Sequence, residues 1–332
     1  MNSRRLSRRL LLAGTGAAAG GLALGATAEA ALAGTQAPPP GPYQPEKGSL
    51  SKHPVAQWYK DAKFGIFIHW GVYAVPAFLG AAEWYLYKMN DARPGHTQTF
   101  DHHKATYGVN FNYDDFIPQF TAAHYDPAKW VDLFEQAGAR YFVLTSKHHD
   151  GFQLFPNKAS KRHSVALGPH SDLVGRLFDA AANSPLKRCL YYSLGEFYNP
   201  ALGTPPHNPY TGKPAPYTGY VPTNDYVGQY EHVHLRTLID KYDPDLLWGD
   251  GHGYHDAGAG IIFHPKVWNW RSDEILAYYY NNAVNRTTPK EVMVNDRFVA
   301  SHADFKTIES DKPSYQLNPK DDMQWEPPQL SA

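Results

Sequence analysis

The sequence KYDPDLLWGDG, residues 241–251, decides which fold we expect for this chain. A helical pattern of apolar residues from Leu235 to Tyr242 leads into a short apolar run, and that run ends at Asp250 between two glycines. Gly249 and Gly251 carry no side chain, so the backbone beside Asp250 would be open to the close approach of a ligand. Aspartate also caps turns frequently. On this stretch alone, a capping role for Asp250 is the favoured explanation.

The same unit, a helix followed by a buried strand that ends in polar residues, recurs along the chain. The patterns predict helices within 126–138, 172–182, 235–242 and 273–281, and strands within 63–71, 141–145, 189–193, 246–250, 291–297 and 304–309. Helices that alternate with strands indicate an α/β fold with a parallel sheet. Polar residues collect at the strand ends and no glycine-rich phosphate loop follows the first strand. A (β/α)8 barrel of the TIM type is therefore favoured over a doubly wound sheet.

Two segments interrupt this alternation. Residues 89–120 have mixed polarity without a clear period, which predicts a long, partly helical excursion. Residues 199–222 form a Pro-, Gly- and Tyr-rich loop, and its length predicts a lid or a wall of a site rather than a linker. Only about six strand–helix units are recognisable, because residues 311–332 cannot supply two more. The barrel that we expect is incomplete.

The N-terminal residues are expected to be an export signal rather than part of the fold. Arg8 and Arg9 precede an Ala-, Gly- and Leu-rich stretch that runs into small residues near Ala33, which resembles a bacterial twin-arginine signal. A membrane anchor is less favoured because the stretch is weakly hydrophobic. We expect residues 1–33 to be the signal, 34–52 a Pro-rich linker and 53–332 the barrel domain. The mature protein would be secreted and would have no membrane span.

Composition narrows the class of protein further. The formal net charge is −1 at pH 7, and loss of the signal removes four arginines but one acid, so a partner nucleic acid is not expected. Aromatic residues make up 14% of the chain, which suits carbohydrate recognition but also suits an aromatic core. The only cysteine, Cys189, lies in an apolar run and is expected in the core.

The strand ends together predict one pocket. It would be lined by His69, Trp70, His148, His149, Tyr192, Asp250, Arg297 and Glu309, with Glu83 and Trp84 from a loop. Carboxylates on different strands of one barrel face suggest a retaining glycosidase, in which one attacks the anomeric carbon and the other protonates the leaving oxygen. The histidines and Glu83 would bind sugar hydroxyls, and Trp84 would cover a C–H face.

Each of these residues also has a structural explanation. His148 and His149 could be core or turn histidines, Arg297 could pair with Asp296, and Glu309 could be a surface acid. A rival chemistry is metal-assisted hydrolysis, with His69, the histidine pair and Asp250 as ligands. Adjacent histidines on an extended chain point in opposite directions, which weighs against this rival. A second group of candidate ligands, from His252 to Asp256, lies in a Gly-rich loop and is expected to be exposed turn.

Six motifs in a fixed order carry a more specific signal. They are WYKDAKFGIFIHWG (58–71), EWY (83–85), KHHDGF (147–152), YYS (191–193), DLLWGD (245–250) and NDR (295–297). Together they resemble the α-L-fucosidases of glycoside hydrolase family 29, over roughly residues 54–309. Agreement of several motifs in order is far more specific than any single motif.

The resemblance implies an exo-acting, retaining enzyme that removes terminal α-L-fucose from fucosylated glycans and uses neither a metal nor another cofactor. By matching position, Asp250 would be the nucleophile that forms a covalent fucosyl intermediate. Glu309 falls where one branch of the family keeps its general acid/base, and Arg297 would bind substrate beside this pair. The family's fucose-binding positions match His69, Glu83, Trp84, His148, His149 and Tyr192.

Family members continue past a Trp-Glu pair, resembled here by Trp325-Glu326, into the last two barrel strands and usually a β-sandwich. We therefore expect a shortened catalytic domain without a β-sandwich, and an oligomer or a partner chain that completes the barrel. Two alternatives to an active fucosidase remain open. One is a fucose-binding remnant without turnover, and the other is a metal-dependent barrel hydrolase.

Overall fold

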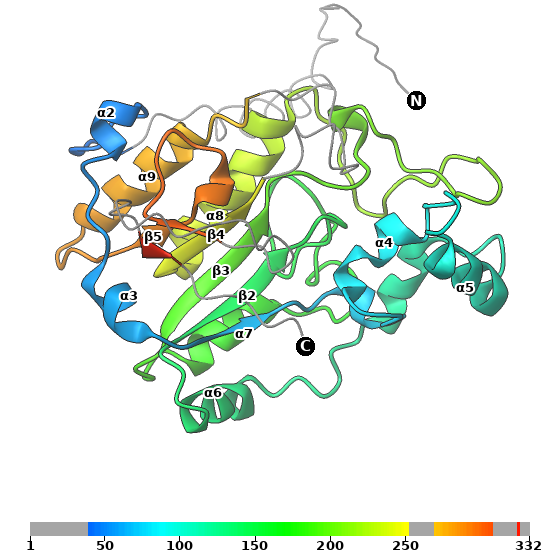
Figure 1. Ribbon diagram of the computed structural model, residues 1–332, viewed down its shortest axis with the longest axis horizontal. Helices are drawn as coiled ribbons and strands as arrows, with labels where there is room; N and C mark the ends of the chain where they lie inside the picture. Colours follow the sequence, from blue (N-terminus) through cyan, green and yellow to red (C-terminus); the bar gives the residue numbers. More distant parts are fainter. Residues whose placement is uncertain (1–38, 252–268, 308–323, 326–332) are drawn as a thin grey trace, which may run out of the picture.

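A five-stranded parallel sheet forms the centre of the computed structural model, which describes residues 39–251, 269–307 and 324–325 (Figure 1). Its strands are β1 (Gly65–Ile68), β2 (Tyr141–Lys147), β3 (Lys187–Ser193), β4 (Leu246–Asp250) and β5 (Met293–Val294). They lie side by side in chain order, and every neighbouring pair is parallel. Five of the six predicted strands are thereby confirmed as one sheet whose carboxyl ends share an edge.

A helix connects each strand to the next from β1 onwards. These helices are α6 (Pro127–Gln136), α7 (Leu173–Ala180), α8 (His232–Tyr242) and α9 (Ser272–Val284). Asp126 caps α6 by accepting from the backbone N–H of Lys129, with Pro127 in the first turn, and Asp172 caps α7 by accepting from Gly175. All four predicted helices are confirmed. The helices in these parallel crossovers pack against the sheet.

The predicted excursion, residues 89–120, is partly helical, since it contains α5 (Gln98–Tyr107) and η3 (Tyr113–Gln119). Together with η2 (Ala82–Trp84) and α4 (Tyr85–Lys88), which precede it, it forms the larger excursion between β1 and α6. Figure 1 shows α4 and α5 in cyan at one side of the molecule, opposite α9. The excursion therefore adds a flank beyond the carboxyl edge of the strands.

Residues 39–52, the described part of the segment that we expected to be a Pro-rich linker, pack onto the domain. The segment contains α2 (Lys47–Leu50) and is followed by α3 (Gln57–Ala62). The backbone N–H and C=O of Tyr43 bond to the side-chain amide of Asn281 on α9, at 3.0 and 2.8 Å. Tyr43 and Leu50 are both buried. The folded domain therefore begins before residue 53, because these apolar side chains bury against α9.

Alternate strand residues enter two different apolar layers. One layer contains Tyr141, Val143, Cys189, Tyr191, Leu246, Trp248 and Met293 together with side chains around α3. The other contains Phe142, Leu144, Leu190, Tyr192, Leu247 and Val294 together with the helices that connect the strands. This alternation follows from the two-residue period of a strand. It decides which side chains near the strand ends can meet Asp250.

The sixth predicted strand lies apart from the main sheet. β6 (Phe305–Lys306) pairs in parallel with β7 (Gln324–Trp325), and a single bridge from Asn295 to Phe305 links it to the end of β5. Within the described ranges the main sheet is open, with β1 and β5 at its edges. No helix in this part of the chain is both long and apolar enough to cross a membrane.

Candidate active site

Asp250 ends β4 at the carboxyl edge of the sheet, and three side chains converge on its carboxylate. Arg297 Nε donates to Oδ1 at 3.0 Å, and the Tyr191 hydroxyl donates to Oδ2 at 2.7 Å. His149 Nε2 lies 3.3 Å from Oδ2. The Asp250 side chain is 11% exposed, so it is held on several sides yet remains reachable from solvent.

These contacts set the charge of Asp250. Burial alone would raise the pKa of the carboxyl group, but the Arg297 charge and hydrogen bonds from His149 and Tyr191 outweigh it and hold the pKa well below its usual value. Asp250 is therefore an ionised carboxylate at neutral pH. An ionised carboxylate can act as a nucleophile or stabilise a developing cation, but it cannot donate a proton.

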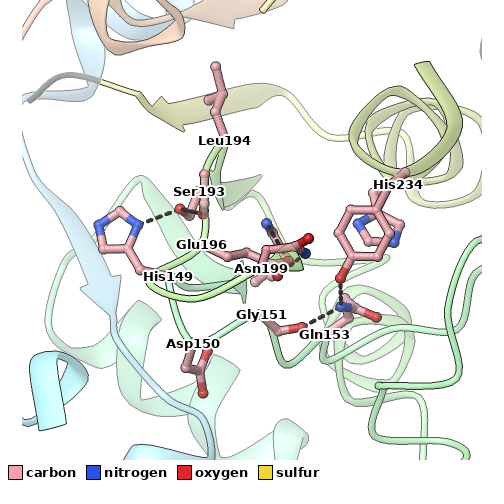
Figure 2. Close-up of polar contacts among 12 residues, drawn as sticks. His149, Asp150, Gly151, Gln153, Ser193, Leu194, Glu196, Asn199 and His234 are labelled. Atoms are coloured by element: carbon pink, nitrogen blue, oxygen red, sulfur yellow. Dashed lines mark hydrogen bonds and ion pairs between the residues drawn. The ribbon is translucent and has the colours of Figure 1, made fainter. Parts of the chain in front are cut away.

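His149 links the Asp250 carboxylate to the end of β3. Figure 2 shows its ring turned toward Ser193, and Nδ1 forms a short hydrogen bond with the Ser193 hydroxyl. That hydroxyl donates its own hydrogen to the Gly195 carbonyl at 2.6 Å, so it can only accept from His149. The other ring nitrogen faces Asp250. Both nitrogens of His149 are thereby engaged with protein groups.

His69 and His148 lie beside this group. The Thr145 hydroxyl donates to the Ile68 carbonyl at 2.6 Å and therefore accepts from His69 Nδ1 at 3.3 Å, which leaves Nε2 of a neutral His69 as an acceptor. His148 is buried, and its ring stacks on Tyr191 with centroids 5.4 Å apart. Burial first, and then its two histidine neighbours, lower the pKa of His148 well below its usual value, so this ring is neutral.

The excursion supplies Trp84 and Glu83 through η2. The Trp84 ring lies 5.6 Å from that of His149 and 5.2 Å from that of Phe197, so it stands at the side of the group around Asp250. Glu83 is half-buried, and within the described ranges its carboxylate makes no hydrogen bond or ion pair. Trp84 also borders a cavity of about 420 Å³ with Tyr87 and Arg93.

The structure thus brings together His69, Trp84, His148, His149, Asp250 and Arg297. Trp70, which we also expected at the pocket, packs on Tyr125 and Trp130 instead, at 4.9 and 5.3 Å. Glu309 and the candidate ligands 252–256 lie outside the described residues.

Tyr192 does not lie in the pocket, where we expected it. It faces the helix layer, its hydroxyl bonds to His234 Nδ1 at 3.0 Å, and it is fully buried. The neighbouring Tyr191, which we did not single out, bonds to Asp250 instead. Strand alternation could have separated the two, because residues 191 and 193 must share one face of β3 and residue 192 the other.

Gly249 and Gly251 do not open the backbone to a ligand, contrary to our expectation. A Cβ on Gly249 would lie 2.5 Å from the Phe298 ring, and one on Gly251 would lie 3.0 Å from Val299. The glycines therefore make room for the chain after β5 rather than for a ligand. Asn295, a residue that we named only within a motif, completes this junction. Its side-chain amide bonds to both the N–H and the C=O of Gly249, at 2.8 and 2.9 Å.

The rings of His148 and His149 lie close together, although we expected adjacent histidines to point in opposite directions. The register between β2 and β3 shifts after Thr145, β2 ends at Lys147, and the rings of His148 and His149 lie with centroids 4.3 Å apart. His149 Nδ1 bonds to Ser193, and its Nε2 faces the Asp250 carboxylate at 3.3 Å. The metal-dependent alternative at Asp250 stays a prediction.

A buried ion pair supports the chain behind His149. Lys147 Nζ lies 3.3 Å from Glu196 Oε1, and both side chains are 0% exposed. Glu196 Oε2 accepts from Asn199 Nδ2 at 2.8 Å, and Figure 2 shows these two side chains next to each other. The backbone N–H of Phe197 also bonds to the His149 carbonyl at 2.7 Å. The loop after β3 is thereby fastened to the end of β2.

The loop 199–222, expected as a lid or site wall, borders a cavity of about 230 Å³. Residues 206–218 of the loop face Tyr113 to Asp115 and the end of α4 across this cavity. Asp250 does not line it. The loop is therefore the wall of a neighbouring hollow, and its role as a lid over Asp250 stays a prediction.

Comparisons with known proteins point to one family. The family model for alpha-L-fucosidase matches residues 30–329. An alpha-L-fucosidase of Branchiostoma floridae is 39% identical over 77% of this chain and 51% of its own length, and human tissue alpha-L-fucosidase is 36% identical over 79% and 51%. The chain thus spans about half the length of these curated relatives.

Solved structures give the same result. A Thermotoga maritima alpha-fucosidase in complex with a mechanism-based inhibitor is 35% identical, with a TM-score of 0.60 over 80% of this chain and 59% of that one. The same enzyme in complex with fucose is 35% identical, with a TM-score of 0.61 over 80% and 59%.

Proposed function

Because the chain belongs to the alpha-L-fucosidase family, we propose that it is an exo-acting, retaining glycoside hydrolase that removes terminal α-L-fucose from glycans. The observation that carries the proposal is Asp250, an ionised carboxylate at the carboxyl edge of a parallel sheet, where barrel enzymes place their catalytic groups. The Thermotoga relative that was crystallised with a mechanism-based inhibitor supports this choice.

In the proposed mechanism Asp250 attacks the anomeric carbon of fucose while the bond to the leaving oxygen breaks. A general acid protonates that oxygen, and water later displaces the carboxylate, so that two inversions give net retention. Arg297 and Tyr191 fix the carboxylate by one hydrogen bond to each oxygen. Neither bond needs to break for one lone pair to reach the sugar, so the nucleophile is pre-positioned.

The sugar would lie between the histidines and Trp84. His69 Nε2 and the Glu83 carboxylate offer acceptors for hydroxyl groups, and the half-buried Trp84 ring offers an apolar face. Arg297, which we also expect to bind the sugar, is held in place by Asp250 and by Trp248. Its guanidinium carbon lies 5.2 Å from the centre of the Trp248 ring.

Hydrolysis of an aryl α-L-fucoside tests the function, and ¹H NMR of the first fucose released tests the stereochemistry. We expect turnover with the α-anomer formed first. A folded chain that binds fucose without turnover would point to the fucose-binding remnant, and release of the β-anomer first would exclude the double-displacement route. Turnover that survives chelation is also expected, since the proposed double displacement uses protein groups alone.

Glu309 remains our proposal for the general acid/base. Its replacement by Ala should slow a fucosyl disaccharide more than an activated aryl fucoside, because only the poorer leaving group needs protonation. Steady-state rates on the two substrates measure this. Equal losses on both would assign the proton transfer to another residue.

Tyr191→Phe and Tyr192→Phe form a matched pair of neighbouring variants. Tyr191→Phe removes the hydrogen bond to the charged Asp250, worth about 1.5–3 kcal/mol, so kcat/KM should fall about tenfold to a hundredfold. Tyr192→Phe removes the hydroxyl that bonds to His234 and should cost about 1 kcal/mol of stability with little change in kcat/KM. Kinetics and urea unfolding of both variants separate the roles. Equal kinetic losses would contradict the placement of Tyr191.

A further inference from the structure

Two histidines converge on one carboxylate oxygen outside the group of side chains that contact Asp250. His53 Nδ1 lies 2.8 Å from Asp304 Oδ1, and His302 Nε2 lies 3.2 Å from the same oxygen. The three atoms all lie within 4.8 Å of one another. His53 comes from the segment before β1, whereas His302 and Asp304 come from the connection between β5 and β6.

The second oxygen of Asp304 is already satisfied by the protein. Oδ2 accepts from the backbone N–H of Val294 at 2.8 Å and from the Tyr280 hydroxyl at 3.1 Å. The Asp304 side chain is 0% exposed. The carboxylate is therefore fixed in one orientation, with Oδ1 presented to the two histidines, as second-shell hydrogen bonds fix the carboxylate ligands of metal sites.

The histidines are held in place as well. The His53 ring stacks on the Tyr280 ring, with centroids 3.6 Å apart and planes 5° apart. The Tyr43 ring meets the His53 ring edge-on, with centroids 5.4 Å apart. The side chain of His53 is 6% exposed and that of His302 is 15% exposed. The side chains of His53 and Asp304 are thus fixed by packing and hydrogen bonds, and the more exposed His302 gives solvent access to the three groups.

The chemistry of these three groups matches a transition-metal site. Two imidazoles and one carboxylate form the protein ligand set of many zinc sites, with a fourth position left for water. A tetrahedral ion with bonds of about 2.0–2.1 Å holds its ligands about 3.3 Å apart. The two measured separations, 2.8 and 3.2 Å, would need to open by only about half an ångström or less.

We propose that His53, His302 and Asp304 bind a divalent transition ion of the zinc type. The ion would replace two hydrogen bonds to a single oxygen by two coordinate bonds from nitrogen lone pairs. It would fasten the segment that contains His53 to the β5–β6 connection, whose Asp304 is itself bonded to Tyr280 of α9. Its role is structural, because Asp304 faces Tyr280 of α9 in the helix layer rather than the group around Asp250.

The test uses the full chain without an affinity tag of histidines, stripped with chelator and then titrated with zinc by calorimetry. His302→Ala is the main variant, because its partly exposed side chain can be removed with little effect on packing. His124→Ala, at an exposed histidine, is the matched control. We expect wild type and His124→Ala to bind one more equivalent of zinc than His302→Ala. Equal stoichiometry in all three would overturn the proposal.

Cobalt gives an independent readout. Bound in the site, Co²⁺ should show the visible absorption of a tetrahedral complex in wild type, and this band should be absent in His302→Ala and in Asp304→Asn. Zinc should also raise the melting temperature of wild type but not of His302→Ala, because an ion that binds only the folded state stabilises it. A wild-type cobalt spectrum that stays octahedral, or a zinc-induced melting shift that His302→Ala retains, would show binding elsewhere on the chain.

Discussion

Replacing Asp250 by Gly should lower turnover of an aryl α-L-fucoside by about 10⁴-fold or more, because the variant has no nucleophile to displace the leaving group. The protein should remain folded. The carboxylate lies at the end of β4 with an 11% exposed side chain, and its loss leaves Arg297 near solvent rather than in the core. Circular dichroism checks the fold, and initial rates check the loss.

Azide or formate should restore part of the lost rate of Asp250→Gly. A small anion can occupy the space left by the carboxylate, where Arg297 and Tyr191 would still favour a negative charge. Attack by azide from that side gives the fucosyl azide of inverted configuration. Asp245→Ala, which changes a buried carboxylate at the other end of β4, is the control and should show no response to azide. Absence of rescue in Asp250→Gly would count against the nucleophile assignment.

Replacing Glu196 by Ala should destabilise the fold by about 3–5 kcal/mol, since it leaves the ammonium group of Lys147 buried without its counter-charge. The Tyr226 hydroxyl at 3.3 Å and the Tyr192 ring at 4.6 Å also contact Nζ, and neither carries a charge, whereas Glu231 and Asp150 act on it without a direct ion pair. Urea unfolding measures the loss. An unchanged unfolding midpoint would mean that the pair does not stabilise the junction of β2 and β3.

The control is the double variant Lys147→Met with Glu196→Gln. It removes both charges and keeps an oxygen for Asn199 Nδ2, so it should recover most of the stability that Glu196→Ala loses. An unrecovered loss would assign the effect to packing rather than to charge.

The destabilisation of Glu196→Ala should also depend on pH. Burial already lowers the pKa of Lys147, and the loss of Glu196 removes the largest of the charges that oppose this lowering, leaving Glu231 and Asp150. Between the folded pKa and the unfolded pKa of about 10.4, the folded variant therefore binds fewer protons than the unfolded one, and its stability rises with pH. The difference from wild type should shrink as the pH rises towards the unfolded pKa, because the buried amine can then be neutral.

Much of the fold could be predicted because its signals are local. The cap Asp126 with Pro127, the helical stripes and the apolar runs each act over a few residues, and the four helices and five sheet strands followed them. The packing of residues 39–52 could not be predicted in this way. It depends on Asn281, which lies more than two hundred residues further along the chain and bonds to the backbone of Tyr43.

The site divides in the same way. Asp250 could be found because it ends an apolar run, and His149 and Arg297 because strand ends of a parallel sheet share one edge. The choice of Tyr192 over Tyr191 failed because the motif was read without the alternation of its strand. The roles of Gly249 and Asn295 were hidden for a different reason. Both depend on how the chain after β5 returns to β4, which no short stretch of sequence encodes.

The chemical modification of Cys189 can be used to measure how often the protein opens locally. It is the sole thiol of the sequence, lies fully buried in β3 between β2 and β4, and its burial raises the pKa of the thiol. A thiol-specific reagent can therefore react only when the apolar layer around α3, which covers Cys189, opens. The rate of that single modification, followed as reagent concentration and temperature vary, would give the frequency with which this layer opens under native conditions. Labelling kinetics would then rank the variants above by local unfolding without any denaturant.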